Sequence, residues 1–199
     1  TPASYAGTSL SALTNDSIKA KQNQISQSEN MKKTLKDNIT NARVHKGNKY
    51  VLTTDLHDFF TRVKHKDVYN ALICLGFVPE IARAITILTT YKGHLPQGGP
   101  ASTTLANHVF AFKVGWQIEQ ITAANGLRFT TFVDDITVSG SVDFKETAQE
   151  IIDLIKANFP ISNKKTHYKT SPSEVTGVKL YNNHLEPTDK TFERLSDNN

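Results

Sequence analysis

The chain has 199 residues, of which 38% are hydrophobic, so it is long enough to bury the core of one catalytic domain. Lysine and arginine number 23 against 19 acids, and the net charge of +4 fits a polyanionic partner. A single cysteine, Cys74, excludes an internal disulfide, and the sequence shows neither a long apolar span nor a signal-peptide pattern, so we expect a cytoplasmic protein with no membrane role.

Residues 1–40 are rich in Ser, Thr, Asn, Gln and Lys and are predicted to form a polar, basic arm. Its lysines form either a solvated face or an RNA contact. A few apolar residues either make a thin helical stripe or belong to a flexible or disordered insertion; they are Ile18, Ile25, Met31, Leu35 and Ile39. The run Asn-Ala-Arg-Val-His at residues 41–45 follows this arm.

A strongly apolar strand is predicted at residues 50–54, and it runs directly into Asp55. Two helices are predicted to follow this strand. The first covers residues 67–75 and is stopped by Gly76, and the second, residues 79–88, opens on a proline.

The segment Leu-Pro-Gln-Gly-Gly-Pro at residues 95–100 is predicted to be a tight loop. Glycines at a helix entrance expose backbone N–H groups to an anion, and the Gln97 amide can hydrogen-bond a nucleotide. Taken alone the signal is weak, because Pro and Gly punctuate most loops. The loop leads into a predicted helix with apolar residues at helical spacing, namely Leu105, Val109, Phe112 and Trp116.

Residues 129–140 are predicted to form a β-hairpin with Asp134 and Asp135 at its tip, since Asp tolerates the backbone angles of a tight connection. Adjacent carboxylates repel one another unless a cation lies between or beside them. The alternative is that the pair only serves the turn. Asp55, at the end of a separate strand, favours the metal site, because three such carboxylates can build a two-metal phosphoryl-transfer centre with two Mg²⁺ ions.

After the hairpin, a capping box at residues 143–146 opens a predicted helix that extends to residue 159. A last strand is predicted at residues 174–181. The element order predicts an α+β fold: a polymerase palm with a ferredoxin-like split βαβ antiparallel sheet and packed helices. An RNA-recognition module has the same order, so the fold alone leaves function open.

These motifs together resemble the reverse transcriptase family. The match rests on Asp-Leu-His-Asp-Phe-Phe at residues 55–60, the loop at 95–100 with Ser102 and Asn107, Phe-Val-Asp-Asp at 132–135, and Asn-Lys-Lys-Thr at 163–166. Within the family, the run at residues 41–45 is similar to the NAxxH signature of bacterial retron enzymes. The triplet Val175, Thr176 and Gly177 is similar to their VTG motif.

The resemblance implies roles for individual residues. Asp55, Asp134 and Asp135 would be the catalytic and metal-binding triad, with the backbone of Leu56 near the metals. The substrate-binding residues would be Phe60 as a steric gate beneath the sugar, Gln97 at the nucleotide or template, and Lys164 or Lys165 near the triphosphate. Core packing is the alternative for Phe60, and a solvated pair is the alternative for the lysines.

Five further residues are predicted to bind RNA: Asn41, His45, Val175, Thr176 and Gly177. Amide, imidazole and hydroxyl groups suit the reading of RNA shape and 2′-hydroxyls. Their structural alternative is that Asn and His cap a loop and Gly marks a bulge.

The retron resemblance implies a structured noncoding RNA as template and primer, deoxynucleoside triphosphates as substrates, and a branched RNA–DNA product. It also implies antiphage defence, with an accessory effector protein as a candidate partner. Other bacterial reverse transcriptases, either defence-associated or group II intron-like, are the alternative within the family. A non-catalytic RNA-binding module is the alternative outside it, but it would leave three acids facing RNA phosphates.

The sequence departs from the family pattern in two ways. Phe132 replaces the usual Tyr before the paired acids, and the stretch between residues 7 and 41 is longer than expected. The fingers that should precede the motifs and the thumb that should follow them are missing, so we expect a fragment. The predicted division is an arm with part of the fingers at residues 1–48, a palm at 49–182, and a thumb-like segment, cut short, at 183–199.

Overall fold

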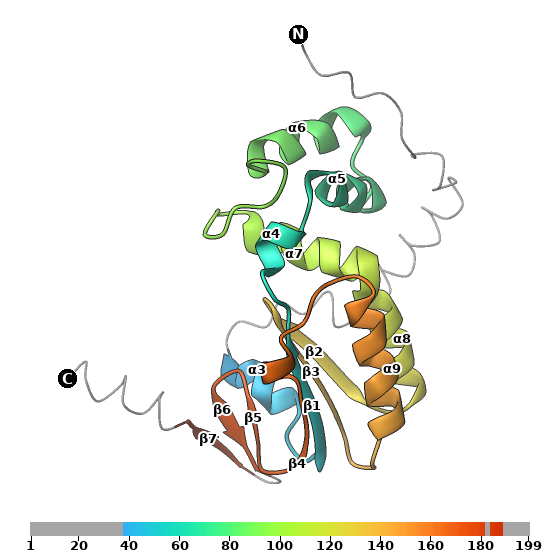
Figure 1. Ribbon diagram of the computed structural model, residues 1–199, viewed down its shortest axis with the longest axis vertical. Coiled ribbons are helices and arrows are strands. Elements are labelled where there is room, and N and C mark those ends of the chain that lie inside the picture. Colours follow the sequence, from blue (N-terminus) through green and yellow to red (C-terminus); the bar gives the residue numbers. More distant parts are fainter. Residues whose placement is uncertain (1–37, 182–183, 189–199) are drawn as a thin grey trace, which may run out of the picture.

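The computed structural model describes residues 38–181 and 184–188, so most of the predicted arm lies outside the described residues. At its centre is a four-stranded antiparallel sheet with the strand order β2-β3-β1-β4 (Figure 1). Its strands are β1 (Tyr50–Asp55), β2 (Arg128–Phe132), β3 (Asp135–Gly140) and β4 (His167–Thr170). This order is that of the ferredoxin-like split βαβ sheet, which confirms the predicted fold class.

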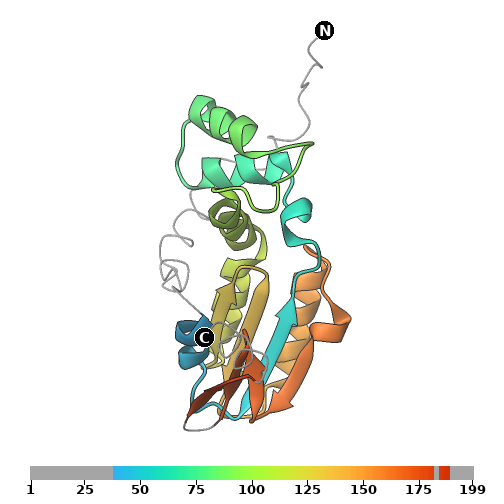
Figure 2. The ribbon, with the colours of Figure 1, turned by 90° about the vertical axis from the view of Figure 1, so that its left-hand side faces the viewer.

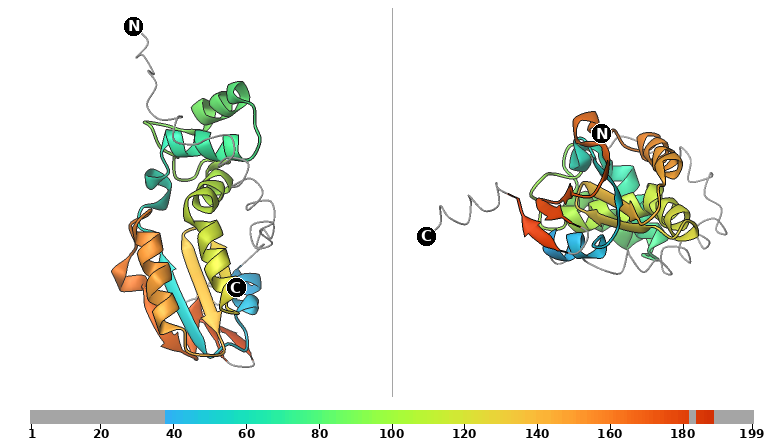
Figure 3. Two further views of the ribbon diagram at one scale, coloured as in Figure 1. Left: turned by 90° about the vertical axis from the view of Figure 1, so that its right-hand side faces the viewer. Right: turned by 90° about the horizontal axis from the view of Figure 1, so that it is seen from below.

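Two helices, α8 (Trp116–Ala124) and α9 (Lys145–Lys156), cover one face of this sheet (Figure 3, left). Side chains alternate between faces along a strand, so Leu52 of β1 packs into the main core with Ile118 of α8 and Ile151 of α9. Val51, the preceding residue, faces the other side. It belongs to a smaller core with Ala42 of α3 (Asn38–Val44) and with the second sheet described next.

The second sheet contains β5 (Ser173–Val175), β6 (Val178–Leu180) and β7 (Leu185–Pro187) and lies beside α3 (Figure 2). The prediction of one strand over residues 174–181 is therefore wrong. Thr176 and Gly177 have φ values of 47° and 78° and form a two-residue turn, which reverses the chain between Val175 and Val178. The fourth strand of the palm sheet is instead β4, which the sequence analysis did not predict.

Four helices lie beyond the end of the sheet at which Asp55 is located (Figure 1). They are α4 (Phe59–Arg62), α5 (His65–Cys74), α6 (Pro79–Thr89) and α7 (Ser102–Phe110). Helix α7 continues through a π-helical turn, η2 (Ala111–Gly115), into α8, so the helix predicted at residues 105–116 is longer than expected and contains an irregular turn. Among the described residues, no helix is long and apolar enough to cross a membrane.

The capping box predicted at residues 143–146 does not form. Phe144 is the N-cap of α9, and its side chain packs in the core. The Asp143 carboxylate accepts hydrogen bonds from the backbone N–H of Lys145 (3.1 Å) and from the Tyr168 hydroxyl (2.7 Å). Tyr168 belongs to β4, so the start of α9 is fixed both by the local Asp143 contact and by a neighbouring strand.

Candidate active site

The three predicted catalytic carboxylates meet at one end of the palm sheet. Asp55 is the last residue of β1 and Asp135 is the first residue of β3, and the two lie directly opposite each other in the antiparallel register. Asp134 occupies the turn between β2 and β3, and its carbonyl oxygen accepts a hydrogen bond from the Leu56 backbone N–H at 3.0 Å. The tip of the hairpin is thus attached to the end of β1.

The turn before Asp135 is strained at Val133 and not at an acidic residue. Phe132 pairs with Asp135, which leaves Val133 and Asp134 as the two turn residues. Val133 has a φ of 57°, a left-handed conformation that β-branched residues rarely adopt. We expected Asp to take the unusual backbone angles, and this was wrong. The strain lies beside the carboxylates, and strained backbone often clusters at functional sites.

Burial and mutual repulsion raise the pKa of both paired acids. Burial is the largest cause of the rise in the pKa of Asp135 to about 6, and the charges of Asp134 and Asp55 add to it. The pKa of Asp134 is also raised, first by burial and then by Asp55. Negative charge is therefore concentrated at this end of the sheet and favours a cation.

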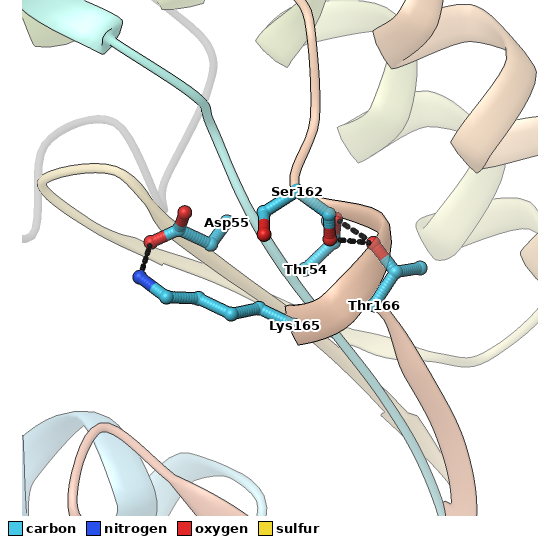
Figure 4. A network of polar contacts seen from close by, with 5 residues as sticks. All are labelled: Thr54, Asp55, Ser162, Lys165 and Thr166. Atoms are coloured by element: carbon cyan, nitrogen blue, oxygen red, sulfur yellow. Dashed lines mark hydrogen bonds and ion pairs between the residues drawn. The ribbon is translucent and has the colours of Figure 1, made fainter.

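Lys165 supplies a positive charge at this position. Its Nζ atom lies 2.8 Å from Oδ2 of Asp55, and this hydrogen bond raises the pKa of the Lys165 ammonium (Figure 4). The Lys165 side chain is 64% exposed, whereas that of Asp55 is 11% exposed. The ion pair therefore joins a fixed, buried carboxylate to a lysine that can move.

A set of polar contacts ties the short helix η3 (Asn163–Lys165) to the end of β1. The Ser162 N–H donates to the Asp55 carbonyl at 2.9 Å. The Thr54 and Thr166 hydroxyls are 2.8 Å apart, and the Thr166 hydroxyl also donates to the Ser162 carbonyl at 2.9 Å (Figure 4). From the sequence, Thr166 was part of the Asn-Lys-Lys-Thr motif without a role of its own, and Thr54 and Ser162 had no predicted role. Thr54 precedes Asp55 directly and Ser162 precedes the motif directly, and these positions were the only signal.

The carboxylates fit a divalent cation by their chemistry, because carboxylate oxygens are preferred Mg²⁺ ligands and a bound cation would offset both the burial and the mutual repulsion that raise the pKa values of Asp134 and Asp135. The arrangement of these side chains in the structure is not that of a metal site. In the part of the chain that the structure describes, no group of three or more His, Cys, Asp or Glu side chains is arranged to hold a metal ion. Oδ2 of Asp55 is bound by Lys165 instead, so a cation at that oxygen requires Lys165 to move away.

The remaining predicted substrate-binding residues differ in burial. Leu56 is buried and forms a bridge with Ile161. Phe60 is half-buried on α4, with its ring centroid 5.8 Å from that of the buried Phe59. Gln97 and Lys164 are exposed, on the loop before α7 and on η3. Their contacts with a nucleotide stay predictions.

A groove of about 350 Å³ connects Asp135 to the turn between β5 and β6. Asp135 and Lys165 line one part of it, and Thr176 and Gly177 line another. Thr53 and Thr137 lie between them along the sheet. The groove therefore connects one predicted catalytic residue, Asp135, with two predicted RNA-binding residues that lie more than 40 positions later in the sequence.

The other predicted RNA-binding residues lie inside the protein. Val175 is a core residue. His45 is fully buried, with its ring nitrogens 2.7 Å from the hydroxyls of Ser139 and Thr130. Burial, and to a smaller extent the charge of Arg128, lower the pKa of His45 to about 3, so its ring is neutral. This arrangement is the structural role that the sequence left open for His45.

Asn41 connects the two retron-like motifs. Its side chain is buried, and its Nδ2 group donates to the Thr176 hydroxyl at 3.3 Å. Asn38 adds a second contact by donating from Nδ2 to the Thr176 carbonyl at 3.2 Å. Thr176 is thus held in its left-handed conformation by α3, and direct RNA contact by Asn41 and His45 stays a prediction.

The fold and the carboxylates at its edge are those of a polymerase palm. The family model described as reverse transcriptase (RNA-dependent DNA polymerase) matches residues 4–180. The chain therefore belongs to the reverse transcriptase family. Among characterised proteins, it is 35% identical over 101 residues to the Retron Ec86 reverse transcriptase of Escherichia coli, covering 51% of this chain and 31% of that protein.

A second relative is the Retron Se72 reverse transcriptase of Salmonella heidelberg (strain 579083-10), which is 30% identical over 162 residues. That match covers 76% of this chain and 42% of the relative, so the chain spans less than half the length of either retron enzyme. Within the family, the chain is therefore retron-like.

Among solved structures, the fold is similar to apo telomerase from Candida tropicalis truncated from the C-terminal domain. The TM-score is 0.64 at 11% identity, and the match covers 92% of this chain and 46% of that one. A likeness at this level of identity supports the palm fold alone.

Proposed function

We propose that this protein copies an RNA template into DNA by Mg²⁺-dependent nucleotidyl transfer at Asp55, Asp134 and Asp135. The observation that carries the proposal is the register of β1 and β3, which sets Asp55 against Asp135 at the end of the sheet. Two divalent cations on these carboxylates would activate the attacking hydroxyl and stabilise charge on the transferred phosphoryl group.

The chain's own residues would do the remaining work. The buried setting of Asp55 and the strained turn at Val133 fix the carboxylates before substrate arrives. Lys165, once away from Asp55, carries an exposed ammonium suited to a triphosphate. The groove from Asp135 to Thr176 and Gly177 would hold a nucleic-acid strand next to the reacting atoms.

The similarity to retron enzymes supports a narrower proposal, that the template and primer are a structured noncoding RNA and that the substrates are deoxynucleoside triphosphates. A role in antiphage defence, an accessory effector protein and a cytoplasmic location belong to the same proposal.

The test is primer extension with Mg²⁺ on an RNA template. Asp134→Asn removes a carboxylate charge from the transition state and is expected to lower the rate ~10³-fold or more. RNA binding measured by fluorescence anisotropy should stay near that of the wild type. Asp153→Asn is the matched control, since this exposed acid lies on α9 and its variant should keep the normal rate. A normal rate in Asp134→Asn would refute the catalytic assignment.

A further inference from the structure

A pair of stacked tyrosines lies at the end of the palm sheet farthest from the carboxylates. The ring centroids of Tyr50 and Tyr168 are 6.2 Å apart with an angle of 21° between the planes. Tyr50 is the first residue of β1 and Asp55 is the last. At about 3.3 Å per residue, the pair lies roughly 17 Å from the catalytic end of the strand.

These rings form part of an open hollow of about 630 Å³, lined by Tyr50, Asp143, Lys145, Tyr168, Lys169 and Thr170. Lysine ammonium groups surround it. Lys145 and Lys169 are exposed, and Nζ of the neighbouring Lys49 lies 5.2 Å from the centre of the Tyr50 ring. Asp143 is the only acid in the lining, so the hollow attracts anions.

The Tyr168 ring is held in place before any ligand binds. Its hydroxyl accepts a hydrogen bond from the Phe144 backbone N–H at 2.9 Å and donates one to Asp143 at 2.7 Å. Its ring packs edge-to-face with that of Phe144, with centroids 5.1 Å apart. A rigid, half-exposed ring loses little entropy when another flat group stacks on it.

Lys169 lines both the hollow and the groove of the active site, so the two lie on either side of the strand that carries it. Lys169 belongs to β4, which is at the edge of the sheet. A strand that leaves the groove over this edge therefore reaches the tyrosines directly. Aromatic rings beside lysines suit unpaired nucleotides, whose bases stack while their phosphates contact the ammonium groups.

We propose that the hollow of Tyr50 and Tyr168 is a second RNA-binding site, which holds one or two unpaired nucleotides of the RNA that the active site copies. The inference rests on the proposed function, and it adds a contact remote from the carboxylates. Lys49 and Lys145 bind phosphates, and the Tyr168 ring stacks on a base.

The first experiment measures binding of a fluorescein-labelled, single-stranded 12-nucleotide RNA by anisotropy at several salt concentrations. In the protein with both Lys49→Gln and Lys145→Gln, we expect about tenfold weaker binding. The slope of the logarithm of the binding constant against the logarithm of the salt concentration should decrease in magnitude by about 1.4, since each lost phosphate contact on a single strand lowers it by ~0.7. Lys156→Gln, at the opposite end of α9 from Lys145, is the matched control. An equal loss in Lys156→Gln, or no loss in the double variant, would overturn the proposal.

The second experiment separates stacking from structural support at Tyr168. Tyr168→Phe loses the hydroxyl contacts that make the ring rigid but keeps the ring itself, so RNA affinity should fall only slightly. Tyr168→Leu loses the ring as well, and about tenfold weaker binding is expected from the loss of one stacked base. If the two variants bind RNA with equal affinity, the proposal is contradicted. It is also contradicted if unlabelled polyglutamate displaces the labelled RNA from both variants as well as unlabelled RNA does, because the hollow is then a plain anion site.

Primer extension on a primer–template too short to reach the hollow separates this inference from the proposed function. The lysine double variant should extend it at the wild-type rate. If the wild-type protein makes no DNA on any template, the proposed function fails, whereas unchanged RNA binding in the double variant contradicts only the second site.

Discussion

The hydroxyls of Thr54 and Thr166 are 2.8 Å apart and join the last turn before β4 to the strand that carries Asp55. Lys165 lies between Thr166 and the rest of η3. The contact therefore fixes the backbone from which the Lys165 side chain reaches the carboxylates. Without the contact between Thr54 and Thr166, Lys165 would keep its charge, but its backbone would no longer be held next to Asp55.

We expect Thr166→Val, which removes the hydroxyl at nearly constant volume, to lower the turnover rate about five- to tenfold, the effect of one hydrogen bond of ~1–1.5 kcal/mol. Thr166→Ser should retain most of the rate. The effect should disappear in the background of Lys165→Ala, because the contact between Thr54 and Thr166 then has no Lys165 side chain to position. A full, additive loss in the double variant would show that Thr166 supports the fold alone.

Sugar selection provides a prediction for Phe60. If its half-buried ring excludes a ribose 2′-hydroxyl, Phe60→Val should raise ribonucleotide incorporation relative to deoxyribonucleotide by about tenfold or more. Competitive single-nucleotide insertion measures this ratio. Phe59→Leu, one residue earlier and fully buried, should lower thermal stability without changing the ratio. Phe60→Val with lower stability and unchanged selectivity would favour the core-packing role.

The contact between Asn41 and Thr176 predicts that the two retron-like motifs stabilise one another. Asn41→Ala and Thr176→Ala should each lower the free energy of unfolding by about 1 kcal/mol, and the double variant should lose less than the sum. Urea denaturation of the four proteins gives the coupling. Additive losses would mean that the 3.3 Å contact contributes nothing.

The same variants test RNA recognition. Thr176 lines the groove, so Thr176→Ala should reduce synthesis on the cognate noncoding RNA more than extension of an unrelated annealed primer–template. Equal losses on both substrates would assign Thr176 to the fold and leave RNA selection to other residues.

His45 makes the stability of the protein dependent on pH. Its pKa falls from 6.5 to about 3 on folding, so the unfolded chain binds the proton more tightly. The contribution of the neutral His45 ring to the free energy of unfolding is fully present above pH 6.5 and is lost as the pH falls toward 3. Between pH 6.5 and pH 5 the loss is about 2 kcal/mol, at ~1.4 kcal/mol per pH unit.

This prediction is tested by urea unfolding of the wild type and His45→Gln at pH 7 and pH 5. The difference in unfolding free energy between the two proteins should shrink by about 2 kcal/mol at the lower pH. Asp135 contributes the opposite slope, since its pKa is raised, but it does so in both proteins and cancels. A difference that is the same at both pH values would show that His45 is not neutral and buried.

The sequence by itself determined three of the four strands of the palm sheet and the places of the predicted catalytic acids within it. Runs of β-branched and aromatic residues specify β1, β2 and β3, and the position of Asp55 at the end of one run and of Asp135 at the start of another follows from local pattern. The strand order then followed from the sequence of elements, because few topologies connect them in this way.

Only the tertiary structure decided how these residues are held. The turn at Thr176 and Gly177 looked like part of a strand, because its left-handed conformation depends on hydrogen bonds from Asn38 and Asn41 far back in the chain. The buried setting of His45, the Thr54–Thr166 contact and the tyrosine pair likewise join residues from separate elements. Hydrogen bonds and stacking act over a few ångströms, so a pattern along one segment cannot reveal a partner more than 90 residues away.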